Sequence, residues 1–397
     1  MCHFDSFYDS DLHHDMSHRP RQPQSSKIGP LVPVDQHTWL LAAEMYRDNK
    51  KAAKDQSTNN TSHLASRIVS RLYVNQLPGQ ELTADRLKRL LRRELADGTE
   101  RKVAASIVDH LFPSTKLPFP VDDEFLDKLK DKWIDENGQN IPGVWSRNKF
   151  RDPPKEFTEE KFRIWMNHLA KAMSAATGKA VQQVWSHHTC NTLPVGSSTK
   201  CKPDLVLLDT NYLKCINDHG IVTDWALIRA FAEVTSQQET PPRIFDTVLN
   251  KSFLCFQCQP ARRLTISLSF NGAGELSLTF ADCEGLLWMP EICLLPDSGY
   301  DAALILLKML AILMFGSEVD IGFDPNFEVH SLTGKIQAIT VDNIQFKVKK
   351  LVYSLDSLVG RGTRVWIVKH GRRHLILKDA WFQKDRLESE QKFLNVI

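Results

Sequence analysis

Two acidic residues stand where strands could present them to a metal ion. Asp204 directly precedes the apolar run Leu205 to Leu208, and Glu233 lies near the end of a second run, Ala226 to Val234. Such carboxylates hold hard divalent cations, and a basic side chain two positions after the glutamate would position an attacking water. Thr235 occupies that position. A hydroxyl carries no charge and cannot replace an ammonium group in stabilising a phosphorane-like transition state, so the sequence predicts a vestigial pair with no confident metal site.

A second set of residues, near the C-terminal end, could contact phosphate groups. Gly360 and Gly362 let the backbone turn sharply and bring amide N–H groups close to an anion. Lys378 ends an apolar run, and Glu390 follows it in a stretch that we expect to be helical, with Glu388 as the second choice. A strand lysine paired with a helix glutamate is how protein kinases hold the α- and β-phosphates of ATP.

Three successive strands should carry these residues, over 351–359, 363–368 and 373–377. An ordinary three-stranded meander with an exposed lysine would give the same pattern. Val365 stands where the third glycine of a kinase loop would be, which argues against tight ATP binding by this chain.

The elements around Asp204 and Glu233 follow a recognisable order. The sequence predicts a helix from Phe157 to Gly178, three short strands, a helix over 243–256 and a hairpin through Asn271. This order, helix, three strands, helix, strand, resembles the PD-(D/E)xK nuclease-like fold. The fold class expected is therefore α/β (α+β) and multidomain. Its parts are a helical N-terminal region, a nuclease-like α/β domain and a partial kinase small lobe of three antiparallel strands with the start of an αC-like helix.

The expected boundaries follow from composition and periodicity. An Arg-rich stretch that begins at Arg86 is the wet face of an amphipathic helix, with a nucleic-acid or nuclear-import patch as the alternative. The predicted segments are a disordered tail over 1–35, a helical region over 36–120, the nuclease-like domain over 121–295, a helix and connector over 296–350, and the truncated lobe over 351–397.

Bulk composition excludes several classes of protein. The net charge of +2 gives no global field toward nucleic acid or an anionic membrane, and the apolar stretch that ends at Phe315 is too short to span a membrane.

Eight cysteines without framework spacing favour reduced thiols in the cytoplasm or nucleus. Cys255 and Cys258 could hold zinc together with His187, His188 or Cys190, but two buried cysteines on one helix explain the spacing more simply.

Taken in order, six segments make the chain resemble the fungal-type protein kinase family over roughly residues 120 to 397. The segments are Lys202-Pro-Asp-Leu-Val-Leu-Leu-Asp, Trp225 to Glu233, Gln259-Pro-Ala-Arg-Arg263, Gly322-Phe-Asp-Pro325, Val359-Gly-Arg-Gly-Thr363 and Leu377-Lys-Asp-Ala-Trp381.

The resemblance implies an ATP-dependent Ser/Thr kinase that uses Mg²⁺ in its complete form, with nucleotide contacts from Gly360, Gly362, Lys378 and Glu390. The H-R-D and D-F-G motifs would follow after Ile397. We therefore expect this chain to be inactive by itself, as a truncated gene model, a pseudogene product or a degenerate paralogue. The alternatives are a non-catalytic binding or regulatory module and a metal-dependent nuclease. A protein substrate or regulator is the expected partner, whereas a membrane and nucleic acid are not.

Overall fold

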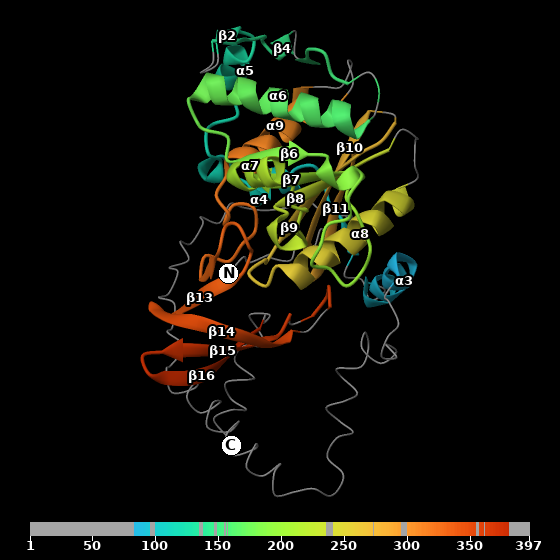
Figure 1. Cartoon of the computed structure of the whole chain (residues 1–397). Helices are drawn as coiled ribbons and strands as arrows, with labels where there is room; N and C mark the ends of the chain where they lie inside the picture. Colours follow the sequence, from blue (N-terminus) through green and yellow to red (C-terminus); the bar gives the residue numbers. More distant parts are fainter. Residues whose placement is uncertain are drawn as a thin grey trace, which may run out of the picture.

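The computed structural model describes residues 83–95, 100–134, 138–146, 149–154, 156, 158–235, 241–272, 274–294, 300–354, 357–360 and 362–380. Two sheets dominate these residues, a seven-stranded mixed sheet and a five-stranded antiparallel sheet that lies beside it (Figure 1). Two short hairpins, β2–β3 and β4–β5, complete the strands. The chain is therefore a mixed α/β structure, as the sequence predicts.

The seven-stranded sheet has the order β1-β11-β10-β9-β8-β7-β6. Strands β6, β7 and β8 form an antiparallel meander, and β8 pairs in parallel with β9, so the chain crosses over through α8. The helices and strands around this sheet are α3 (Ala84–Glu94), β1 (Glu100–Lys102), α4 (Ile107–Leu111), α5 (Asp123–Lys128), β2 (Trp133–Ile134), β3 (Asn140–Ile141), β4 (Trp145–Ser146), β5 (Lys149–Phe150), α6 (Glu159–Thr177), β6 (Gln183–Ser186), β7 (Leu205–Asp209), α7 (Thr210–His219), β8 (Ala230–Val234), α8 (Pro241–Cys258), β9 (Thr265–Phe270), β10 (Glu275–Asp282), β11 (Gly285–Cys293) and α9 (Tyr300–Phe315).

Helix α6 has the caps that its sequence indicates. The Thr158 side chain accepts a hydrogen bond from the Lys161 N–H at the first turn, and Gly178 ends the helix in the left-handed conformation, with φ +68°. The predicted stripe, which includes Trp165 and Leu169, is buried. The order helix, three strands, helix, strand is thus observed as α6, β6, β7, β8, α8 and β9.

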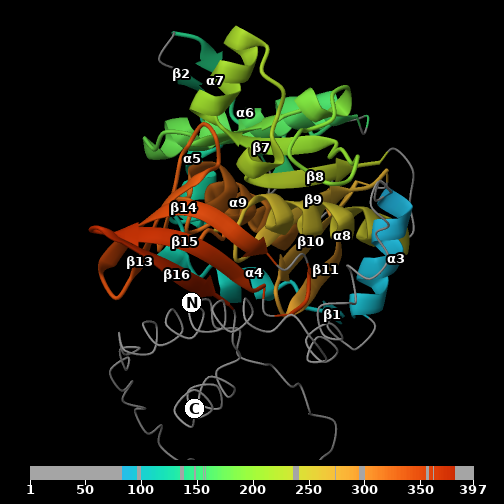
Figure 2. The same ribbon diagram turned by 60° about the horizontal axis from the view of Figure 1, so that its bottom comes forward.

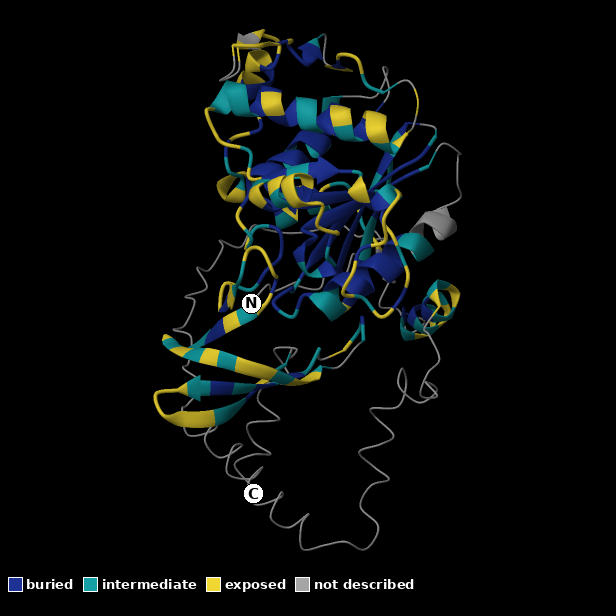
Figure 3. Cartoon of the chain, in the orientation of Figure 1, coloured by how far each residue is buried: buried dark blue, intermediate teal, exposed yellow. Residues whose placement is uncertain are grey.

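Helices cover both faces of the seven-stranded sheet, and the residues of its central strands β8 and β9 are accordingly buried on both sides (Figures 1 and 3). Helices α6 and α9 contribute to one apolar core, while α3, α7 and α8 contribute to the other. Helix α9, which lies in the segment over 296–350 where a helix was expected, is buried along nearly its whole length. Among the described residues, no helix is both long and apolar enough to cross a membrane.

The five-stranded sheet has the order β12-β13-β14-β15-β16 and is antiparallel throughout. It carries many more exposed residues than the larger sheet (Figure 3). Its strands are β12 (Phe327–Val329), β13 (Ile336–Val341), β14 (Ile344–Ser354), β15 (Arg364–His370) and β16 (Arg373–Asp379).

The two sheets share one apolar core. Trp366, Val368 and Leu377, from one face of the five-stranded sheet, belong to the same buried cluster as Leu306 and Met309 of α9. Figure 2 shows the smaller sheet beside α9 and α4. The core that covers one face of the large sheet therefore also holds the small one.

The structure does not test the predicted domain boundaries. Two strands nevertheless connect segments that were predicted to be separate. Strand β1, from the stretch expected to be helical, pairs in parallel with β11 at the edge of the large sheet. The three strands expected after residue 350 are the last three of five, because β12 and β13 precede them. The bounds of the first one, predicted as 351–359, were wrong, since β14 begins at Ile344 and ends at Ser354. The tail over 1–35, most of the helical region, and Glu388 and Glu390 lie outside the described residues.

Candidate functional site

The glycine-rich loop joins β14 to β15, whose ends pair through Ser354 and Arg364. Gly360 has φ +132° and Gly362 has φ +49°, so both occupy the half of backbone space that side chains with a Cβ disfavour. The loop therefore has the positions that the sequence predicts and a backbone shape that needs glycine.

This loop is packed against the large sheet and its helices. The Gly360 N–H donates to the Cys283 carbonyl in the β10–β11 turn at 2.7 Å, and the Leu358 N–H donates to Glu94 Oε2 of α3 at 3.0 Å. The Leu358 side chain is 1% exposed and lies in the same apolar cluster as α3 and α8. Beneath the loop, next to Phe253 of α8, is a cavity of about 20 Å³, which has room for a single water.

Lys378 lies on β16 directly opposite Val365 of β15, and Ile376 lies opposite Ile367. Opposed residues of an antiparallel pair point to the same face, so these four side chains share one face of the sheet. None of them is buried, and Lys378 is exposed. The lysine thus stands beside an open apolar surface, at the strand end nearest the glycine-rich loop.

Arg263 joins this sheet to the rest of the molecule. Its Nη2 donates to both carboxylate oxygens of Asp379 at 3.0 Å, and its Nε donates to Asp324 Oδ2 at 3.0 Å. Its guanidinium also lies 5.1 Å from the centre of the Phe327 ring. Since Asp379 directly follows Lys378, this largely buried arginine fixes the end of the strand that carries the lysine.

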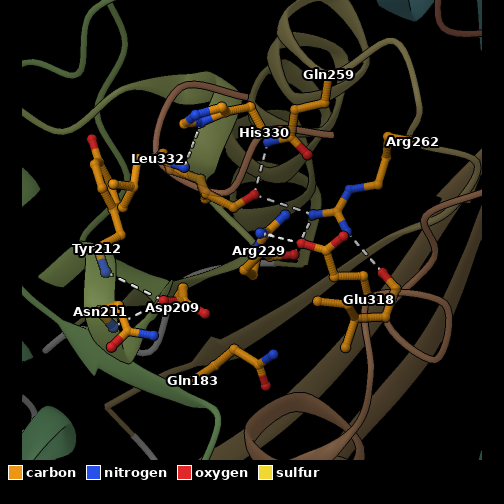
Figure 4. A network of polar contacts seen from close by, with 12 residues as sticks. Gln183, Asp209, Asn211, Tyr212, Arg229, Gln259, Arg262, Glu318, His330 and Leu332 are labelled. Atoms are coloured by element: carbon orange, nitrogen blue, oxygen red, sulfur yellow. Dashed lines mark hydrogen bonds and ion pairs between the residues drawn. The ribbon is translucent and has the colours of Figure 1, made fainter. Parts of the chain in front are cut away.

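Arg262, the neighbouring arginine, points the opposite way, into the core. Its side chain donates to the carbonyls of Ile321, at 2.8 Å, and Ile228, at 3.2 Å, and its guanidinium lies 4.1 Å from the centre of the Phe323 ring. Beside it, the buried Arg229 pairs with Glu318 (Figure 4). Arg262 is 1% exposed, so it is a structural group that holds backbone carbonyls and faces no phosphate.

Gly322 explains why a glycine begins the Gly322-Phe-Asp-Pro325 segment. Its φ is +100°, and a Cβ on it would lie 2.3 Å from the Leu264 carbonyl oxygen. The close approach lets the Gly322 carbonyl accept hydrogen bonds from the N–H groups of Arg263, at 2.8 Å, and Leu264, at 3.2 Å. Three of the six segments that carry the resemblance, those with Arg263, Asp324 and Asp379, therefore meet at one junction.

Asp204 and Glu233 also lie together, on adjacent strands. Leu205 pairs with Ala232, which places Asp204 beside Glu233, and Asp204 Oδ2 accepts a hydrogen bond from the Val234 N–H at 2.9 Å. The predicted pairing of the two carboxylates in space is present.

A lysine that the sequence interpretation missed completes this cluster. Lys251 of α8 forms an ion pair with Glu233 Oε2, and the two side chains are only 3% and 11% exposed. The strand itself supplies no ammonium group, because Thr235 stands two positions after Glu233. An ammonium group is present all the same, since Lys251 reaches Glu233 from α8. A lysine on the apolar face of α8, between Val248 and Cys255, was the sequence feature that could have revealed it.

Burial dominates the electrostatics of this cluster. It raises the pKa of Glu233 to about 7, although the Lys251 ammonium acts in the opposite direction. Glu233 Oε1 has no hydrogen-bond partner of ordinary geometry, while the Asp204 N–H lies near enough to favour the ionised form. A buried carboxylate with one oxygen that lacks a hydrogen bond is a candidate for binding a ligand or taking up a proton.

The cysteines and histidines considered as zinc ligands do not form a cluster among the described residues. Cys255 is buried, and Cys258 donates weakly to the Gly196 carbonyl at 3.4 Å. Within the described ranges, no three His, Cys, Asp or Glu side chains are grouped to hold a metal ion, which gives the zinc hypothesis no support.

Among the comparisons with known proteins, the one with protein-family models gives a match. The sequence model described as fungal protein kinase matches residues 202–397, which begins at the Lys202-Pro-Asp segment and includes both the glycine-rich loop and Lys378. No curated protein and no solved structure matches the chain.

Proposed function

Through residues 202–397 the chain belongs to the fungal protein kinase family, and on that premise we propose that its five-stranded sheet is the nucleotide-binding face of a protein kinase small lobe. The complete kinase would transfer phosphate from ATP to Ser or Thr hydroxyl groups. The observation that carries this proposal is the shared position of Lys378 and two glycines with positive φ at one end of the β14–β16 meander.

The residues present fit the nucleotide better than they fit its metal ion. The apolar side chains of Val365, Ile367 and Ile376 offer a flat surface for a base, and Lys378 beside them offers a positive charge for phosphates. Asp379, the nearest carboxylate on the strand, is already held by Arg263. ATP would bring the transferable γ-phosphoryl group with its magnesium ions, whose protein ligands in kinases lie on the large lobe.

The lysine can be tested against a lysine on the same sheet. Lys378→Met should weaken binding of a fluorescent ATP analogue with Mg²⁺ by roughly tenfold or more, because it removes a charged phosphate contact. Lys369→Met is the matched control, since Lys369 is four residues from Val365 along β15, or about 13 Å. Equal binding by the two variants would contradict the assignment of Lys378.

A second candidate function rests on the separate Lys251 contact. We propose that the α6 to β9 segment is nuclease-like, with Asp204 and Glu233 as divalent-cation ligands and Lys251 as the group that positions the attacking water. What matters for hydrolysis is where the ammonium lies and not which element carries it.

Plasmid nicking with Mg²⁺ or Mn²⁺ tests this second candidate. Asp204→Asn and Lys251→Met should both abolish nicking, whereas Asp218→Asn, at an exposed carboxylate of α7, should leave it unchanged. Nicking that survives Asp204→Asn, or its absence from the unaltered chain, would leave the non-catalytic binding module as the function of this segment.

A further inference from the structure

The N–H groups in the first half of the glycine-rich loop already donate hydrogen bonds to acceptors on α3 and in the β10–β11 turn. The Leu358 N–H donates to Glu94 Oε2 at 3.0 Å, and the Val359 N–H also favours the ionised form of that carboxylate. The next N–H, of Gly360, donates to the Cys283 carbonyl at 2.7 Å. Three successive amide groups of the loop are thus directed at groups of α3 and of the β10–β11 turn.

Backbone N–H groups that converge on one carboxylate form the kind of site that binds anions. A carboxylate and a phosphate oxygen accept the same charge-assisted hydrogen bonds from such groups. The glycine-rich loop of a kinase uses its backbone to cover the phosphates of ATP. Glu94 therefore binds, with an anion of the protein itself, the part of the loop that leads into Gly360. On the other side of the glycines, Arg364 donates to the Phe256 carbonyl of α8, so the loop is held toward α3 and α8 and away from the sheet face that carries Lys378.

Helix α3 holds Glu94 at this place through both apolar and polar contacts. Leu87 and Leu91 of α3 are buried in the same cluster as Leu358 of the loop. Arg92 Nε of the same helix pairs with Asp246 of α8 at 2.5 Å. The carboxylate is thus delivered by a helix that is packed along its length against α8.

Because Glu94 is partly buried, its carboxylate and the N–H groups of the loop depend on each other for hydrogen bonds. Burial raises the pKa of this carboxyl to about 7, while the N–H groups of Leu358 and Val359 lower it. Leaving the loop would therefore cost Glu94 its main hydrogen-bond donors, and leaving Glu94 would cost the loop its acceptor.

We propose that α3 is an autoinhibitory element, in which the Glu94 carboxylate binds the N–H groups of Leu358 and Val359, holds the glycine-rich loop against α3 and α8, and so competes with a nucleotide for the loop. The inference rests on the proposed nucleotide-binding function of the five-stranded sheet. It goes beyond that function because Glu94 lies outside residues 202–397, the part of the chain that matches the kinase family. Nucleotide binding then requires that α3 move away from the loop, or that its carboxylate be neutralised.

Glu94→Gln tests the competition in the full chain, because glutamine has nearly the same size but no charge. Binding of a fluorescent ATP analogue with Mg²⁺ should tighten by about tenfold relative to the unaltered chain. Asp85→Asn, at an exposed carboxylate on the same helix, is the matched control and should bind as the unaltered chain does. Hydrogen exchange at the Leu358 and Val359 amides should become faster in Glu94→Gln only.

The outcomes separate this inference from the function on which it rests. Equal nucleotide affinity for Glu94→Gln and the unaltered chain, with measurable binding by both, would overturn the competition and leave the nucleotide site intact. Faster amide exchange in Glu94→Gln without nucleotide binding by either chain would overturn the proposed nucleotide site, and the competition with it. A gain of affinity in Asp85→Asn equal to that in Glu94→Gln would show that general charge, and not the contact of Glu94 with the loop, controls binding.

Discussion

At the scale of single residues, Lys251 and Glu233 form an ion pair that is largely buried. Their side chains are 3% and 11% exposed, and only Glu233 Oε2 is paired. Removing one partner of such a pair leaves an uncompensated charge in a low-dielectric site. The pair is therefore a sensitive point for stability as well as a candidate site.

Lys251→Met should destabilise the protein by about 3 kcal/mol or more at pH 8 and by less at pH 5.5. The pKa of Glu233 is already raised to about 7, so at the lower pH this carboxyl takes up a proton and needs no partner. Urea unfolding at the two pH values measures the difference. The double variant Lys251→Met with Glu233→Gln should regain most of the stability, and an equal loss at both pH values would show that Glu233 is not the cause.

Asp282 gives a second residue-scale prediction, with a defined sign. Burial raises its pKa from 3.8 to about 6, so the folded state binds a proton more tightly than the unfolded state. Its contribution to stability is full below pH 4 and is lost as the pH rises through 6. Asp282→Asn can keep the hydrogen bonds from the Glu284 and Gly285 N–H groups without that loss.

Asp282→Asn should consequently be more stable than the unaltered protein at pH 8, by up to about 3 kcal/mol, and equally stable near pH 4. Denaturant unfolding across this range is the measurement. Asp218→Asn, at an exposed site, should change stability little at either pH. A constant difference between Asp282→Asn and the unaltered protein at all pH values would contradict the role of burial.

At the scale of elements, the junction between the two sheets depends on backbone contact as much as on side chains. The Gly322 carbonyl accepts hydrogen bonds from the N–H groups of Arg263 and Leu264, just before β9, and the Arg263 side chain reaches from there to Asp324 and Asp379. One short segment thus sets both the position of β16 and the approach of the loop after α9.

Gly322→Ala should destabilise the protein by more than 2 kcal/mol, because the new Cβ would meet the Leu264 carbonyl oxygen at 2.3 Å and because φ is +100°. Gly220→Ala is the matched control. Gly220 also has positive φ, at +62°, but a Cβ there meets nothing within 4 Å, so we expect a loss of about 1 kcal/mol. Thermal unfolding of the two variants measures the difference, and equal losses would show that backbone strain alone matters.

At the scale of the whole molecule, the two sheets do not have separate cores. Trp366 is 2% exposed and lies 6.1 Å, centre to centre, from the Phe327 ring, in the cluster that also contains α6 and α9. A shared core couples the stability of the parts that it joins.

The described sheets should therefore unfold in a single transition, and Trp366→Ala should lower the stability of both by about 3 kcal/mol. Calorimetry tests this through the ratio of the van't Hoff and calorimetric enthalpies, and hydrogen exchange through the amides of β9 and β15. A separate transition for the five-stranded sheet, or a loss confined to β15, would show that the small sheet is an independent unit.

The sequence by itself determined the elements and the family. Strand and helix positions follow from local periodicity, so the helix from Phe157 to Gly178 and the three strands near Asp204 appear close to where the pattern predicts them. The meander around Gly360 is also present, but its first strand, predicted over 351–359, is β14 (Ile344–Ser354). The six ordered segments identified the family, which the match over residues 202–397 confirms. The pairing of Asp204 with Glu233 was predictable too, since both lie at the ends of neighbouring strands.

Only the tertiary structure decided which groups surround these residues. Glu94 and Leu358 are 264 residues apart in sequence, Arg263 and Asp379 are 116 apart, and Lys251 reaches Glu233 from a different element. No local pattern encodes such contacts, because each depends on how a helix crosses a sheet after the core has formed. The packing of α3 and α8 against the large sheet therefore determines both the lysine at the acidic pair and the carboxylate on the glycine-rich loop.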